Sequence, residues 1–157
     1  MHKRAMFHAY DGPGWPELSW LEPYFLSPPG KRWFFESGSD SARFVIEGLH
    51  GTENKVPFKS RVDADLCMWA HPQYGVLLIY SKWGGGYADC FNSKGDMRRI
   101  REWVRTLHDD LRPVGLYIPF EWAWGAVKEF LQTDGKLPGS IEWIASRDLP
   151  PDTFPDP

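Results

Sequence analysis

Several features that other protein classes need are scarce in this sequence. It has two cysteines, Cys67 and Cys90, so disulfides are not expected to organise the fold, and a reducing compartment is favoured. No run approaches the roughly twenty apolar residues that span a bilayer. The basic start, 1–8, lacks the apolar stretch of a secretory signal. We therefore expect a cytoplasmic protein with no membrane partner.

Positive charge is also scarce. The chain has 18 Lys and Arg against 21 Asp and Glu, for a net charge of -3. A general nucleic-acid binder normally carries a basic excess that neutralises phosphates, so nucleic acid is not the expected partner. Acidic side chains outnumber basic ones over 121–157, which follows a more basic segment, 94–112.

Aromatic side chains, in contrast, are plentiful. They make up 16% of the 157 residues, with nine Trp, ten Phe and six Tyr. A chain of this length is expected to form a single domain, and one domain of this size hardly buries so many large rings completely. Some rings are therefore expected at the surface, where they anchor partners.

The chain is predicted to divide into a proline-rich arm, 1–30, a core, 31–147, and a proline-rich tail, 148–157. The arm and the tail are expected to be irregular. Short runs of β-branched and aromatic residues predict the strands, with turns at 71–73 and 84–86. The predicted strands are 33–36, 43–47, 66–70, 74–82, 87–91 and 140–144.

Two helices are predicted from apolar residues spaced three and four apart. The first is 96–111, with Ile100 and Val104 on its apolar side, and the second is 120–133. Pro119 opens the second helix and Gly135 closes it. The expected fold is therefore α+β, with an antiparallel sheet packed by two main helices.

The cysteines and histidines could form a metal site or a disulfide, but their spacing in the sequence favours neither. Cys67, His71, Cys90 and His108 have no paired metal-ligand spacing, so no metal and no cofactor are expected. The two cysteines lie on strands flanking a central one, about 10 Å apart, which is too far for a disulfide. We interpret both as core residues, with a small hydrolase using a Cys/His pair as the alternative function.

A basic stripe suggests a second alternative, a protein or nucleic-acid adaptor. On the predicted helix 96–111 and its flanks, five cations fall within about 60° of one another. They are Lys94, Arg98, Arg101, Arg105 and Arg112. We interpret the stripe as the solvated face of that helix, because the chain as a whole is acidic.

The region from Tyr117 to Trp143 resembles a known family. An Ile-Pro pair opens a helix with alanines and a terminal Phe-Leu, followed by Gly, Pro and a closing strand ending in Trp. The matching residues are Pro119, Ala123, Ala126, Phe130, Gly135, Pro138 and Trp143. This pattern is similar to the end of the first-numbered Imm family of bacterial polymorphic-toxin immunity proteins. The resemblance implies a small cytoplasmic protein, not an enzyme, that binds and blocks a cognate toxin of the nuclease or deaminase type.

The expected contact residues are aromatic and acidic. Glu121 and Glu129 lie on the polar side of the predicted helix 120–133, and Trp122 and Trp124 lie at the two edges of its apolar stripe. The predicted hairpin around 84–86 adds three more, Trp83, Tyr87 and Asp89. Such groups are expected to cover a basic substrate cleft of the toxin.

Overall fold

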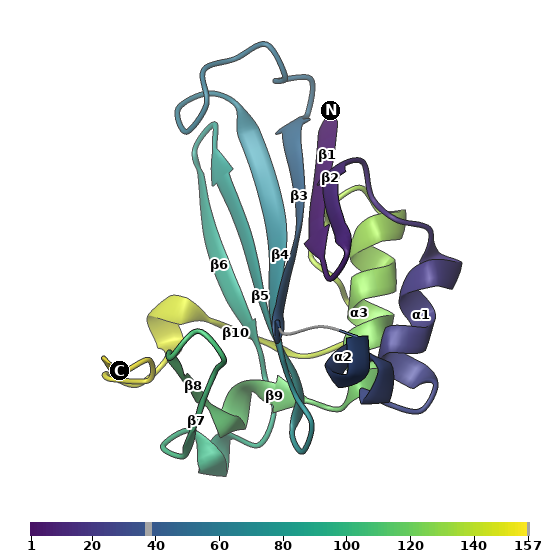
Figure 1. Ribbon diagram of the computed structural model, residues 1–157. Helices are drawn as coiled ribbons and strands as arrows, with labels where there is room; N and C mark the ends of the chain where they lie inside the picture. The colour runs from purple at the N-terminus through teal and green to yellow at the C-terminus, as the bar shows by residue number, and fades with distance from the viewer. Residues whose placement is uncertain (37–38, 157) are drawn as a thin grey trace.

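The computed structural model describes residues 1–36 and 39–156 and has an α+β fold built on an eight-stranded, mostly antiparallel sheet (Figure 1). Along its main path the strand order is β10-β6-β5-β4-β3-β1-β2, and β9 pairs with β5. The strands are β1 (His2–Phe7), β2 (Tyr10–Pro13), β3 (Ser41–Leu49), β4 (Val62–His71), β5 (Gly75–Gly84), β6 (Tyr87–Ser93), β9 (Tyr117–Ile118) and β10 (Trp143–Ala145). The predicted fold class is confirmed.

The central meander β4-β5-β6 confirms the strands and turns predicted at 66–91. On β5, Val76, Leu78 and Tyr80 point to one side, while Leu77 and Ile79 point to the other. This two-sided burial is typical of a central strand with cover on both faces. The predicted spacing of the cysteines also holds, because Cys67 on β4 and Cys90 on β6 flank β5, and both are free.

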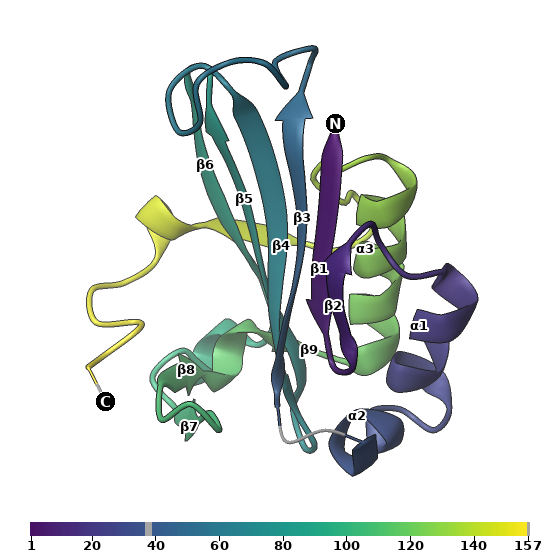
Figure 2. The ribbon, with the colours of Figure 1, turned by 45° about the horizontal axis from the view of Figure 1, so that its top comes forward.

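Two helices, α1 (Leu18–Leu26) and α3 (Phe120–Gln132), cover one face of the sheet, which we call the helix face (Figures 1 and 2). The prediction of α3 is confirmed, and its Ala126, Val127 and Phe130 are fully buried against the sheet. Gly135 ends the helix, since its N–H donates to the Phe130 carbonyl at 3.0 Å. No helix in 1–36 or 39–156 is long and apolar enough to cross a membrane.

The predicted helix 96–111 is wrong. A 3-10 turn, η1 (Met97–Arg99), leads into a small hairpin of β7 (Trp103–Arg105) and β8 (Leu111–Pro113), followed by η2 (Val114–Leu116). Ile100 and Val104 still pack on the sheet, but Leu107 is exposed in the hairpin turn. One residue of the apolar pattern that predicts a helix therefore lies at the surface. This hairpin, and not a second helix, covers the lower part of the other face, which we call the open face.

The predicted basic stripe does not form, because it needs that helix. Arg98 pairs with Asp96, Arg105 pairs with Asp109, and Arg112 lies 3.9 Å from the ring centroid of Trp69. These cations belong to different turns and strands. The adaptor hypothesis therefore loses the surface on which it depends.

The irregular N-terminal arm is also wrong. Residues 2–13 form two strands of the sheet, and α1 packs on α3 despite Pro23 within it. Burial of Leu21 and Phe25 offsets the backbone hydrogen bond that Pro23 removes. The predicted strand at 33–36 lies in α2 (Lys31–Glu36), where Trp33 is fully buried against Phe7 and Phe25.

The C-terminal segment is close to the prediction. The last strand, β10, is displaced along the chain from the predicted 140–144, and Trp143 packs at the edge of the core. The tail forms one 3-10 turn, η3 (Ser146–Asp148), and then irregular backbone. It stays against the open face, where Trp103 Nε1 donates to the Thr153 carbonyl at 2.9 Å.

Candidate protein-binding surfaces

The predicted contact residues fall on two separate surfaces. Glu121, Trp122, Trp124 and Glu129 belong to α3, which begins at the lower end of the sheet in Figure 1. Trp83, Tyr87 and Asp89 belong to the β5–β6 hairpin, whose turn lies at the upper end, beyond the helices (Figures 1 and 2). The structure therefore does not bring the seven residues together.

Trp122 stands at the rim of a groove beside the first turn of α3. The Trp122 side chain is 61% exposed. The other eight tryptophans, all in the described part of the chain, are buried or half-buried. The groove has a volume of about 470 Å³ and is lined by Lys94, Glu121, Trp122, Gly125, Ser140 and Glu142. Gly125 lines the groove from within α3, where glycine costs about 1 kcal/mol in helix propensity relative to alanine. We call this region the Trp122 groove.

Two of the predicted α3 contacts have other roles. Trp124 is only 5% exposed, and its ring centroid lies 5.4 Å from that of Phe25. It is a core residue, because the helix turns it toward α1. Glu129 accepts a hydrogen bond from Ser140 N at 3.1 Å. Its pKa is held below the ordinary value by the Gly139 backbone N–H and by Ser140. It therefore fixes the loop after α3.

The upper end of the sheet forms the second surface, which we call the hairpin end. It consists of the β3–β4 loop, 50–61, and the β5–β6 turn, 84–86. Tyr87 is 41% exposed, with Lys82 Nζ 4.0 Å from its ring centroid. Trp83 lies opposite Asp63 on the open face, and its indole N–H has no partner among the described residues.

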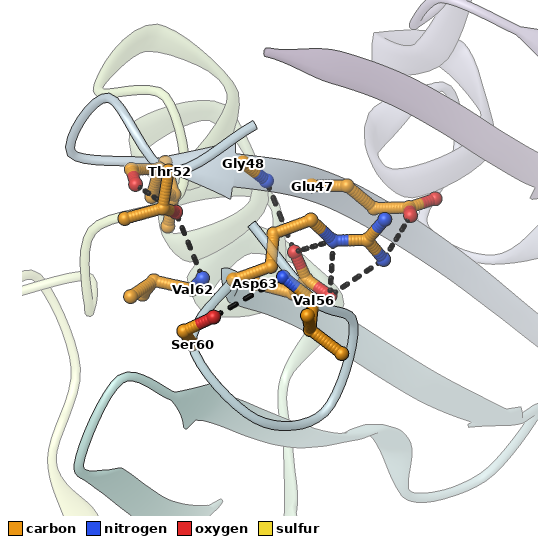
Figure 3. Close-up of polar contacts among 9 residues, drawn as sticks. Glu47, Gly48, Thr52, Val56, Ser60, Val62 and Asp63 are labelled. Atoms are coloured by element: carbon orange, nitrogen blue, oxygen red, sulfur yellow. Dashed lines mark hydrogen bonds and ion pairs between the residues drawn. The ribbon is translucent and has the colours of Figure 1, made fainter. Parts of the chain in front are cut away.

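A polar network holds the β3–β4 loop in one conformation (Figure 3). Asp63 is 1% exposed, accepts from Gly48 N at 3.0 Å, and pairs with Arg61. The hydrogen bond to Asp63 raises the pKa of Arg61, and Glu47 adds a second ion pair. Thr52 accepts from Val62 N at 2.9 Å and donates to Leu49 O at 2.6 Å. The loop is thus fixed to both of its strands.

The β5–β6 turn packs directly on this loop. Gly85 N donates to the Lys59 carbonyl at 2.7 Å. At Gly84 a Cβ would stand 1.9 Å from the Arg61 carbonyl oxygen, and φ is +83°, so only glycine permits this approach. The glycine run predicted as a turn therefore also locks two hairpins together.

Residues 55–59, which carry no predicted contact residue, form the tip of the loop. Phe58 is 80% exposed and Val56 is 55% exposed. Phe58 also has φ +64°, in the left-handed region that costs a non-glycine residue about 1 kcal/mol or more. The sequence signal for the tip is an apolar triplet between two lysines, Lys-Val-Pro-Phe-Lys.

A further cavity of about 420 Å³ lies on the open face near Arg43, Cys67 and Trp69. Burial raises the pKa of Cys67 to about 12, and its Sγ contacts Asp65 at 3.6 Å. The thiol is therefore protonated at neutral pH and is a poor nucleophile. Arg43 is paired with the buried Asp65 at 2.8 Å. Within the described part of the chain, no three His, Cys, Asp or Glu side chains are grouped to hold a metal ion.

Comparison with protein-family models, with curated proteins and with solved structures gives no significant match.

Proposed function

We propose that this protein neutralises a protein toxin by binding it, as immunity proteins of the family it resembles do, and that the Trp122 groove is the contact surface. The observation that carries the proposal is the exposure of Trp122, a large aromatic side chain, beside a groove on the solvent-facing side of α3. Tryptophan is enriched among the few side chains that carry most of the binding energy at protein interfaces. The binding needs no cofactor and takes place in the cytoplasm.

The support beneath Trp122 suits it to this role. Phe120 and Ala123, on either side of it in the chain, are buried in the core, so the first turn of α3 is held against the protein. A ring presented from such a turn loses little conformational freedom on binding. The groove next to it provides a concave site for a partner side chain.

Charge supports a partner with a basic cleft. Glu121 and Glu142 line the groove and have no ion pair with a described residue, although Lys94 reduces their combined charge. Other acids of this region are engaged: Glu129 binds Ser140, and Asp134 pairs with Lys3 at 2.7 Å. We therefore assign long-range attraction of the toxin chiefly to Glu121 and Glu142.

Co-expression tests the proposed function. The toxin to test is the end domain of a large secreted protein, where one is encoded immediately upstream in the genome. Cells that produce this domain are expected to survive with the wild-type protein and to die with Trp122→Ala at equal protein abundance. Phe58→Ala is the matched control, an exposed aromatic on the other surface, and is expected to protect. Death with the wild-type protein contradicts the proposal.

A further inference from the structure

The tip of the β3–β4 loop has a chemistry unlike that of the Trp122 groove. It consists of Lys55, Val56, Pro57, Phe58 and Lys59, all of them exposed. The loop lies at the upper extremity of the sheet, on the opposite side from the hairpin β7–β8 (Figures 1 and 2). An apolar triplet is thus presented at one end of the molecule, with a lysine on each side.

The tip keeps its shape without help from a partner. The Val56 carbonyl accepts from the backbone N–H groups of Lys59, Ser60 and Arg61 at 3.2, 3.1 and 2.9 Å. Val56 N donates to Ser60 Oγ at 3.1 Å, which closes the turn (Figure 3). The strained backbone of Phe58 persists because this turn determines it, and strain of this kind accumulates at functional sites.

The free charge at the tip is positive. Lys55 and Lys59 have no ion pair with a described residue. The neighbouring carboxylates are engaged, since Glu53 pairs with the N-terminal ammonium group and Asp63 pairs with Arg61. The acidic net charge of the whole chain is screened over about 8–10 Å at physiological salt. An approaching surface therefore meets the two lysines first.

We propose that the 55–59 tip docks on an anionic lipid membrane, with Phe58 and Val56 entering the interface and Lys55 and Lys59 contacting lipid headgroups. Three apolar side chains are too few for a stable protein interface, which buries about 800 Å² on each partner. They suffice for shallow, reversible insertion when lysines add attraction to anionic lipids. The expectation of no membrane partner rests on the lack of a membrane-spanning run and of a secretory signal in the sequence. A loop that docks on a membrane surface needs neither of them.

Vesicle co-flotation of the purified full chain tests this proposal independently of any toxin. Wild-type protein is expected to float with vesicles of phosphatidylcholine and phosphatidylglycerol in equal parts, but not with phosphatidylcholine alone. Phe58→Ala is expected to lower the partition coefficient about 10-fold, because the protein loses the aromatic side chain that enters the membrane interface. Lys55→Gln and Lys59→Gln are each expected to lower it roughly 5-fold. Raised salt is expected to abolish binding.

Trp122→Ala is the matched control, because it removes an exposed ring from a groove that Glu121 and Glu142 also line, and it is expected to bind vesicles like the wild type. Circular dichroism confirms that each variant is folded. The proposal is wrong if the wild type ignores the anionic vesicles, binds the neutral ones equally, or binds independently of Phe58. It is also wrong if Phe58→Ala weakens a toxin complex and leaves vesicle binding unchanged, since the tip is then a protein contact.

Discussion

Trp122 and Phe58 are both exposed aromatic side chains, but the molecule presents them in opposite ways. Trp122 projects from a regular helix whose buried side supports it, next to the carboxylates of Glu121 and Glu142. Phe58 projects from a loop with φ +64°, held by hydrogen bonds and flanked by lysines. An exposed ring is thus held either by the packing of its own helix or by a polar network behind its loop, and we propose that the neighbouring charge decides which partner each ring meets.

The largest expected effect comes from removing a core side chain of α3, the helix that carries Trp122. Phe130 is fully buried between α3 and the sheet, with its ring centroid 6.1 Å from that of Tyr80. Phe130→Ala is expected to lower the free energy of unfolding by about 3–5 kcal/mol, through lost transfer energy and a new cavity. Urea denaturation measures this loss. An unchanged melting temperature would mean that the side chain is not in the core.

The second effect concerns the network behind the tip. Asp63→Ala leaves Gly48 N without its acceptor and leaves Arg61 with Glu47 as its one remaining carboxylate partner among the described residues. The free energy of unfolding is expected to fall by about 2 kcal/mol, because a buried backbone N–H becomes unsatisfied and Arg61 loses one of two ion pairs. The control is Glu102→Ala, which removes the ion pair with Arg99 on the surface and is expected to leave the melting temperature unchanged. Equal losses in the two variants would show that burial does not distinguish the pairs.

Glycine at position 58 and glycine at position 122 are expected to change the free energy of unfolding in opposite directions. Phe58→Gly relieves a positive φ that glycine adopts freely, so the free energy of unfolding should rise by up to about 1 kcal/mol. Trp122→Gly places glycine in a helix, so it should fall by about 1 kcal/mol. Trp122→Ala separates loss of the ring from loss of helix propensity. Chemical denaturation giving the same sign at both positions would refute the strain at Phe58.

The last effect begins only at alkaline pH. Burial raises the pKa of Cys67, on the open face, from 9.0 to about 12, and that of Tyr80, on the helix face, from 10.0 to about 12. Both groups lose their proton more readily in the unfolded chain, so stability is full below pH 9.0 and falls as pH rises toward about 12. Denaturation across this range measures the decline. Cys67→Ala should remove the part of the stability loss that begins near pH 9.0. A pH dependence of stability that is the same in Cys67→Ala and in the wild type would contradict the burial of the thiol.

The parts of the fold that follow from sequence are those in which one local signal decides. At α3, Ala126, Val127 and Phe130 repeat at helical spacing between Pro119 and Gly135, and the helix forms as predicted. In the meander, the turns at 71–73 and 84–86 separate the strands as expected. The same spacing rule fails at 96–111, because Leu107 belongs to a turn and no core lies beneath it. There, tertiary contacts override the pattern.

The candidate site residues also differ in how far local sequence predicts them. Helical periodicity places Trp122 and Trp124 at the edges of the stripe, but it does not say which of them the packing of α1 covers. Phe58 is harder still to find, because the position of its loop depends on long-range contacts such as Gly85 N with the Lys59 carbonyl. A loop conformation determined by contacts distant in sequence leaves little trace in the local pattern of residues.

The central claim is that Trp122 is the anchor for the toxin, and calorimetric titration of the purified toxin domain tests it most directly. Trp122→Ala is expected to weaken binding at least roughly 10-fold, by more than about 1.4 kcal/mol, as at interface hot spots. Phe58→Ala is expected to leave the affinity unchanged. A Trp122→Ala protein that binds the toxin as tightly as the wild type, while Phe58→Ala binds weakly, would contradict the account and place the contact at the hairpin end.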